Sequence, residues 1–179
     1  EFYSEKIGLS KTVIFSGWVL NVAMVYADLD VLALTSMNEG TPVSIIEAMA
    51  AGVPVLATNA GGGKDLLGDA VEAKNRYPFC VCDRGVLCNR RDVNSIVAGL
   101  GYLAKKDGSI QAAVQHFVQN ARDYVIKNYG RERLISDIEH LYQELVDEKR
   151  NGVTNIGAKT VKEHILKDPH GGRYVPSLP

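Results

Sequence analysis

The chain has 179 residues, of which 46% are hydrophobic and 23% are charged, and its formal net charge is −1. This balance is typical of one globular domain with a sizeable core. A net charge near zero gives no reason to expect nucleic acid or an anionic membrane as a partner, and no apolar run approaches the roughly 20 residues that a membrane-spanning helix needs.

The N-terminal part of the chain predicts strands that alternate with short helices. Residues 12–16 are a β-branched run that ends before Gly17, and we expect a strand there. Residues 21–29 predict a short helix. Residues 30–35 are almost continuously apolar, as in parallel strands that are covered on both faces, so they predict a second, buried strand.

The clearest helix signal lies at residues 41–52. Thr41 suits the N-cap position and Pro42 suits the first helical position. Gly52 suits the left-handed conformation that ends many helices. A third buried strand is predicted immediately after it, at residues 53–58.

The remaining elements complete an α/β pattern. A glycine-rich turn at residues 59–63 leads to a short helix that opens at residues 65–67, and two short strands and three helices follow at residues 79–82, 86–88, 94–104, 109–127 and 131–149. Strands alternating with helices predict a doubly wound parallel sheet, a Rossmann-like domain over residues 1–149. Residues 150–179 are predicted to be a polar tail.

The chain has three cysteines, Cys80, Cys82 and Cys88. An odd number of cysteines in a chain of this length argues against a disulfide scaffold and for the reducing cytoplasm. A metal site would need a fourth ligand, and no histidine lies close to the cysteines in sequence. We therefore expect buried cysteines on strands, and neither a metal nor a cofactor.

Ligands of doubly wound sheets lie at the carboxyl ends of the strands, which points to the loops at residues 17–21, 36–41 and 58–63. In the second loop, Glu39 precedes a helix start whose free N–H groups form an anion site suited to a diphosphate. Glu47 projects away from the apolar face of that helix, where it can meet a ligand. A carboxylate there is equally an ordinary partner of the helix dipole.

The other two loops each allow two interpretations. Gly61 and Gly62 permit positive φ and a close approach of the backbone to a ligand, or they serve the turn alone. Gly17, Trp18 and Val19 offer backbone and an aromatic surface beside a flat base, or Trp18 packs against a neighbouring domain or the tail.

Taken together, these segments resemble the donor-binding core of family 4 glycosyltransferases, which are retaining enzymes with the two-Rossmann-domain fold called GT-B. The hallmark is a pair of glutamates separated by seven residues, here Glu39 and Glu47 within EGTPVSIIEAMAAGVPV. Residues 84–87 and Asp92 resemble a later stretch of the family. The similarity covers about residues 8–148.

The resemblance implies a role for each of these positions. Glu47 would bind the ribose hydroxyls of the nucleotide, and Glu39 would contact the transferred sugar as the carboxylate of the catalytic site. Gly61 and Gly62 would approach the donor closely, and Trp18 would lie beside the base with its neighbours Gly17 and Val19. The backbone expected to meet the diphosphate is that of Gly40, Thr41, Pro42 and Val43.

The sequence departs from the family pattern in two ways. Asp65 stands where many members carry glutamate. The family's basic pair, which neutralises the diphosphate, does not precede Thr12. We therefore expect the C-terminal half of a GT-B fold, truncated at its N-terminus, which is inactive alone and works with an N-terminal acceptor domain of the same protein. A sheet edge left exposed in this way can pair with a second copy.

The function that the resemblance implies is metal-independent transfer of a hexosyl or N-acetylhexosaminyl group, with retention, in glycan or polysaccharide biosynthesis. The expected donor is a nucleotide diphosphosugar, taken to be a UDP-sugar, although the residues themselves leave the base open. The acceptor is an unknown sugar or lipid-linked molecule. The alternatives are a sugar-nucleotide epimerase of the same fold, which needs no acceptor, and a donor-like domain that only binds.

Overall fold

The computed structural model describes residues 1–71, 77–105 and 107–150. The chain comprises two compact units, Glu1–Gly130 and Arg131–Pro179. In the second unit the described part is one helix, α7 (Arg131–Arg150). The predicted boundary after residue 149 falls where the described residues end and stays a prediction, and the predicted tail lies outside them.

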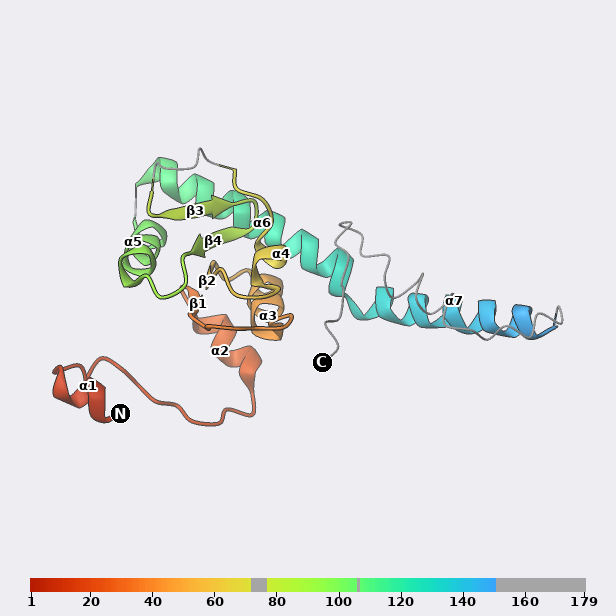
Figure 1. The fold of residues 1–179 in the computed structure, drawn as a ribbon, viewed down its shortest axis with the longest axis horizontal. Coiled ribbons are helices and arrows are strands. Elements are labelled where there is room, and N and C mark those ends of the chain that lie inside the picture. The colour runs from red at the N-terminus through yellow and green to blue at the C-terminus, as the bar shows by residue number, and fades with distance from the viewer. Residues whose placement is uncertain (72–76, 106, 151–179) are drawn as a thin grey trace, which may run out of the picture. The chain divides into compact units, whose positions relative to one another are not determined.

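The first unit is built on a sheet of four strands in the order β1-β2-β4-β3 (Figure 1). The strands are β1 (Leu32–Leu34), β2 (Val55–Thr58), β3 (Phe79–Cys82) and β4 (Gly85–Cys88). β1, β2 and β4 are parallel, whereas β3 pairs with β4 in the antiparallel direction. The predicted α/β class with a mainly parallel sheet is confirmed, with β3 as the exception.

The described residues of the first unit form six helices: α1 (Phe2–Lys6), α2 (Val22–Asp28), α3 (Val43–Ala51), α4 (Gly63–Leu67), α5 (Val93–Leu103) and α6 (Gly108–Tyr129). The predicted helices are present with shifted ends, and α4 begins at Gly63 rather than at Asp65. No helix within the described ranges combines the length and apolar character that crossing a membrane requires.

Apolar side chains fill both faces of the sheet, and β2 lies in the middle with all four residues buried. Val55 and Ala57 belong to the core cluster that includes residues of α2, α3 and α4, whereas Leu56 belongs to the cluster with residues of α5. Figure 1 shows α3 and α5 on opposite sides of the strands. Gly99 lets α5 approach the sheet, because a Cβ there would lie 2.8 Å from the Leu56 side chain.

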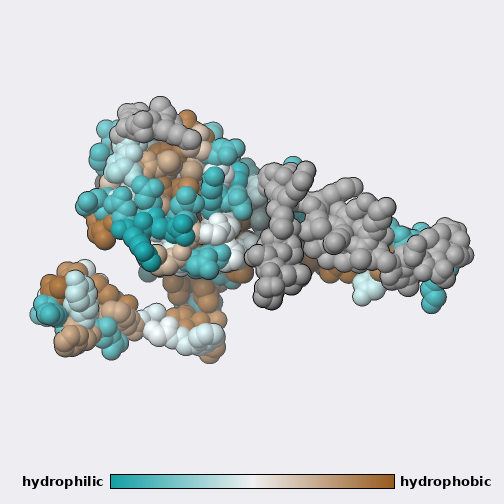
Figure 2. All heavy atoms as spheres, viewed as in Figure 1, coloured by the Kyte–Doolittle hydropathy of each residue, from teal (hydrophilic) through white to brown (hydrophobic). Residues whose placement is uncertain are grey.

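Residues 12–16 do not form the predicted strand. Thr12 and Val13 donate backbone hydrogen bonds to Leu9 in a turn, and the side chains of Ile14 and Phe15 are 87% and 53% exposed. Figure 2 shows apolar surface along this segment. β-branched composition favours an extended backbone, but a strand forms only where a neighbouring strand supplies hydrogen-bond partners, and no described strand pairs with these residues.

β1 is only half-buried, although a fully buried strand is predicted there. Ala33, in the middle of β1, is exposed. The reason is position: β1 is the last strand at its end of the described sheet and has a hydrogen-bonded neighbour on one side only.

The three cysteines lie on β3 and β4 as predicted and are unpaired; Cys82 and Cys88 are buried and Cys80 is partly exposed. Burial raises the pKa of the Cys82 thiol to about 11, so this thiol stays protonated at neutral pH. Among the residues that the structure describes, no group of three histidine, cysteine or carboxylate side chains gathers as a metal site requires.

Arg84 connects α4 to the rest of the first unit, and its side chain is only 12% exposed. Its Nε donates to the carbonyl of Leu66 at 2.7 Å, and its Nη2 donates to the carbonyl of Asp65 at 3.0 Å. The guanidinium carbon lies 3.9 Å from the centre of the Tyr124 ring of α6. Arg84 thus satisfies carbonyls at the end of α4 that have no partner within the helix.

Replacing Arg84 with alanine should lower the free energy of unfolding by about 2–3 kcal/mol, because two carbonyls of α4, one of them partly buried, lose a charged donor and the Tyr124 ring loses its cation. Urea unfolding followed by circular dichroism measures this loss. The control is Arg131→Ala, since the ion pair of Arg131 with Glu132 is 83% exposed on both sides and is worth about 0–1 kcal/mol. Equal losses in the two variants would mean that Arg84 does not hold α4.

Candidate functional site

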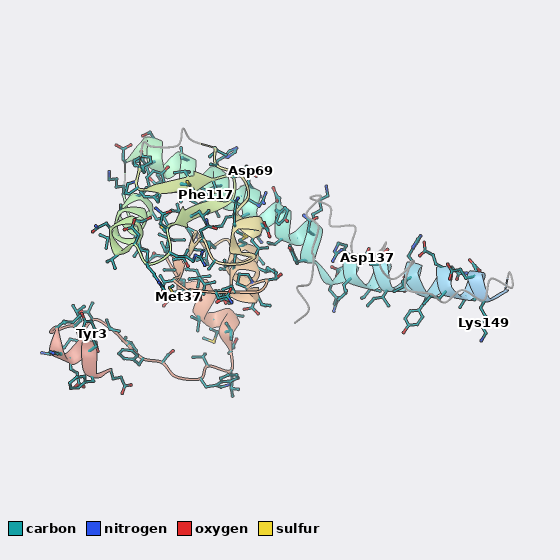
Figure 3. The ribbon with its side chains drawn as sticks, viewed as in Figure 1. Tyr3, Met37, Asp69, Phe117, Asp137 and Lys149 are labelled. Carbon is teal, nitrogen blue, oxygen red and sulfur yellow. The ribbon has the colours of Figure 1, made fainter. Side chains whose placement is uncertain are left out.

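Two loops meet at the carboxyl ends of the parallel strands. The loop at residues 36–41 follows β1, and Figure 3 labels Met37 within it. The glycine-rich loop at residues 59–63 follows β2. The N–H of Gly62 donates to the carbonyl of Gly40 at 2.9 Å, so the two predicted ligand loops are joined directly through their backbones.

The glycines of the second loop are required by this contact. Gly61 has a φ of +56°, and a Cβ on it would overlap the carbonyl oxygen of Glu39. A Cβ on Gly62 would lie 2.6 Å from the carbonyl oxygen of Gly40. The sequence left open whether these glycines serve a ligand or the turn alone. The structure gives a reason for them in the turn, because they let one loop lie against the other. Their contact with a donor stays a prediction.

The end of β2 also holds the start of the Glu39 loop. The buried Thr58 is the last residue of β2, and its hydroxyl donates to the carbonyl of Ser36 at 2.5 Å. From the turn that follows β4, Arg90 contacts the same loop, with its Nη1 3.5 Å from the carbonyl of Met37. Both side chains contact backbone carbonyls of the loop, so they fix its path before Glu39.

Helix α3 begins one residue later than predicted. Pro42, not Thr41, is the N-cap, with φ −74° and ψ 105°, and no side chain caps the helix. The ψ of Pro42 is extended rather than helical, so Pro42 lies outside the helix and takes the flanking position that the sequence suggested for Thr41. The first helical hydrogen bond runs from Ile45 to the carbonyl of Pro42. The N–H groups of Val43 and Ser44 precede it, as an anion site at a helix start requires.

Gly52 ends α3 as predicted. Its φ is +77° and its ψ is 24°, the left-handed conformation, and its N–H bonds back to the carbonyls of Ala48 and Met49. Within the helix, Ile45, Ala48 and Met49 are buried against the sheet, whereas Glu47 is exposed. The predicted orientation of Glu47, away from the apolar face, is therefore confirmed.

Glu47 has a partner that the sequence did not indicate. The hydroxyl of Tyr26, on α2, donates to Oε2 of Glu47 at 3.0 Å. Burial, then the hydrogen bond to Glu47 and its charge, raise the pKa of Tyr26 to about 12. In the sequence Tyr26 contributes to the apolar spacing of a short helix, and its polar end gives no sign of a partner 21 residues away.

The third predicted loop is less constrained. Gly17 has a φ of +63° with open space around it. The side chain of Trp18 is 91% exposed, and Val19 is partly buried. An indole that is 91% exposed is not packed against the residues that the structure describes. The placement of Trp18 beside a base stays a prediction.

The family described as glycosyl transferases group 1 matches residues 1–145. The chain belongs to this family. The match covers both loops and α3, and it confirms the resemblance to GT-B glycosyltransferases that these segments indicate.

Two relatives illustrate the family. N-acetyl-alpha-D-glucosaminyl L-malate synthase of Bacillus anthracis is 26% identical over 148 residues, which cover 83% of this chain and 35% of the relative. UDP-Gal:alpha-D-GlcNAc-diphosphoundecaprenol alpha-1,3-galactosyltransferase of Escherichia coli is 24% identical over 147 residues, which cover 82% of this chain and 34% of the relative. The chain thus spans about a third of the length of the curated relatives it matches.

A solved structure supports the fold. HepE of Anabaena, in complex with UDP, superposes with a TM-score of 0.64 at 20% identity, over 79% of this chain and 35% of that chain. This likeness concerns the fold alone, and it agrees with one α/β part of a GT-B protein.

Gly61→Ala should reduce stability more than Gly52→Ala does. Both glycines have positive φ, so each variant loses about 1–2 kcal/mol from the left-handed backbone. Only Gly61 lies against another chain segment, and the overlap with Glu39 should cost about 1–3 kcal/mol more. Urea unfolding of the two variants gives the difference. If Gly61→Ala loses no more than Gly52→Ala, the contact between the loops is not a constraint.

Proposed function

We propose that the chain is the donor-binding part of a retaining glycosyltransferase, which transfers a hexosyl or N-acetylhexosaminyl group from a UDP-sugar to an acceptor hydroxyl. The observation that carries the proposal is the fixed contact between the glycine loop and the Glu39 loop beside the uncapped start of α3. Glu39 and the N–H groups of Val43 and Ser44 belong to the same loop–helix segment at the carboxyl edge of the sheet, which suits a carboxylate and an anion site that act on one ligand.

The anion site suits the leaving group of such a transfer. When the bond from the sugar to the diphosphate breaks, negative charge develops on the departing phosphate oxygen. Free N–H groups at a helix start, together with the positive end of the helix dipole, stabilise charge at that point. In this proposal the α3 start meets the diphosphate, and Glu39 positions the transferred sugar rather than acting as a covalent nucleophile.

The base of the nucleotide is the least constrained part of the proposal. UDP is our first choice because the name of the E. coli relative specifies a UDP-sugar and HepE was solved with UDP. We place the base beside residues 17–19. The acceptor, a sugar or a lipid-linked molecule, is assigned to an N-terminal domain of the same protein, and the unpaired cysteines favour the cytoplasm.

The first test is a thermal-shift series with uridine, guanosine and adenosine diphosphates. A nucleotide at a hundredfold above its dissociation constant stabilises the folded state by about 2.7 kcal/mol. We expect this for UDP and a smaller shift for the other two. Equal shifts with all three would leave the donor unspecified, and no shift with any, repeated on the longest form of the protein, would contradict the proposal.

Glu47→Ala should weaken UDP binding by about 1.5–3 kcal/mol, or roughly 10- to 150-fold, because hydrogen bonds from the ribose hydroxyls to a charged group are lost. Glu47→Gln, which keeps one oxygen acceptor, should lose less. Isothermal titration calorimetry measures both affinities.

The control for these variants is Asp123→Ala. Asp123 is an exposed carboxylate on α6 that accepts a hydrogen bond from Gln119 of the same helix, so its removal changes the net charge equally without touching α3. An unchanged affinity for UDP in Glu47→Ala would remove the proposed role of Glu47.

A further inference from the structure

The geometry points to Tyr26 as a positioning residue for the donor: its hydroxyl holds the carboxylate of Glu47 in one orientation, so that the other carboxylate oxygen is presented to the ribose. This inference rests on the proposed function, because it presumes that Glu47 binds the ribose. It goes further by assigning a role in recognition to a residue on a different helix.

The hydrogen bond joins a buried donor to an exposed acceptor. Tyr26 is 9% exposed and belongs to the same core cluster as Ala48 and Met49, which directly follow Glu47 in α3. Its hydroxyl lies 3.0 Å from Oε2 of Glu47. The ring of Tyr26 is therefore held by packing, and the hydroxyl is a fixed point at the edge of the core.

A hydrogen bond that fixes the side chain matters more for the exposed Glu47 than it would for a buried residue. An exposed glutamate samples several rotamers, and a ligand that selects one of them pays the entropy of ordering the side chain. A hydrogen bond already made in the free protein removes part of that cost. Only one oxygen is engaged by Tyr26, and a carboxylate can accept further hydrogen bonds at the other.

Tyr26 is suited to donate and not to accept at this position. Burial, the hydrogen bond and the charge of Glu47 together raise the pKa of the phenol to about 12. The phenol is therefore protonated at neutral pH, and the interaction is a charge-assisted hydrogen bond to a carboxylate, which is stronger than one between neutral groups.

The test uses Tyr26→Phe, which keeps the ring in the core and removes only the hydroxyl. Calorimetric titrations would compare the affinity for UDP with that for 2′,3′-dideoxyuridine diphosphate, which lacks the ribose hydroxyls. Tyr26→Phe should bind UDP about 3- to 10-fold more weakly, as expected for one hydrogen bond, and should bind the dideoxy analogue as the unaltered protein does. In a Glu47→Ala background, Tyr26→Phe should cause no further loss.

Tyr102→Phe is the matched control. Tyr102 is also a buried tyrosine, but it belongs to the other core cluster, so removing its hydroxyl should leave both affinities unchanged. An equal loss for both nucleotides in Tyr26→Phe, or an additive loss in the double variant, would show a general structural role and overturn the inference. If Glu47→Ala weakens UDP binding but Tyr26→Phe does not, the inference fails and the proposed function stands. If Glu47→Ala itself has no effect, the ribose role of Glu47 fails first.

A second measurement keeps Tyr26 in place and so does not depend on the folding of Tyr26→Phe. Glu47→Ala removes both the acceptor and the charge, so the pKa of Tyr26 should fall from about 12 towards the ordinary tyrosine range. Spectrophotometric titration of the tyrosines would show one tyrosine shifting to lower pH. An unchanged titration curve would mean that the two side chains do not interact, and would overturn the inference.

Discussion

The backbone contact between the two loops is the constraint on which the candidate site depends. The hydrogen bond from Gly62 to Gly40 leaves no space for a side chain at Gly61 or Gly62. The hydroxyl of Thr58 donates a second hydrogen bond to the same loop, at the carbonyl of Ser36. The position of Glu39 is thus set by backbone atoms of a neighbouring strand–helix connection. A loop backbone held this way needs little reorganisation when a ligand arrives, which favours binding.

The same arrangement links Glu39 to Glu47. The loop that carries Glu39 runs directly into α3, which is anchored in the core by Ile45, Ala48 and Met49 and ended by Gly52. The two glutamates therefore belong to one strand–loop–helix unit, and one face of its helix is buried against the sheet. The apolar packing of α3 therefore fixes the backbone positions of both glutamates.

The sequence was sufficient for the features that depend on local pattern. The α/β class, the glycine-ended α3, the loops at the carboxyl edge and the exposed orientation of Glu47 follow from periodicity and from residues with special backbone preferences. It was insufficient where the outcome depends on a distant partner. A strand at residues 12–16 needs a neighbour that no described strand supplies, and the pairing of Tyr26 with Glu47 joins two helices that periodicity treats separately. The N-cap was misassigned by one residue because Pro42 takes an extended ψ of 105°, which the usual preference of proline for the first helical position did not predict.

The antiparallel strand has a consequence for how the sheet assembles. β3 and β4 are separated only by Asp83 and Arg84, so their pairing closes a short loop, whereas each parallel pair must first close a crossover that contains a helix. Short loops close faster and at a lower entropic cost. We therefore expect the β3–β4 hairpin to form early, and to offer β4 as the template on which β2, and after it β1 with the Glu39 loop, is added.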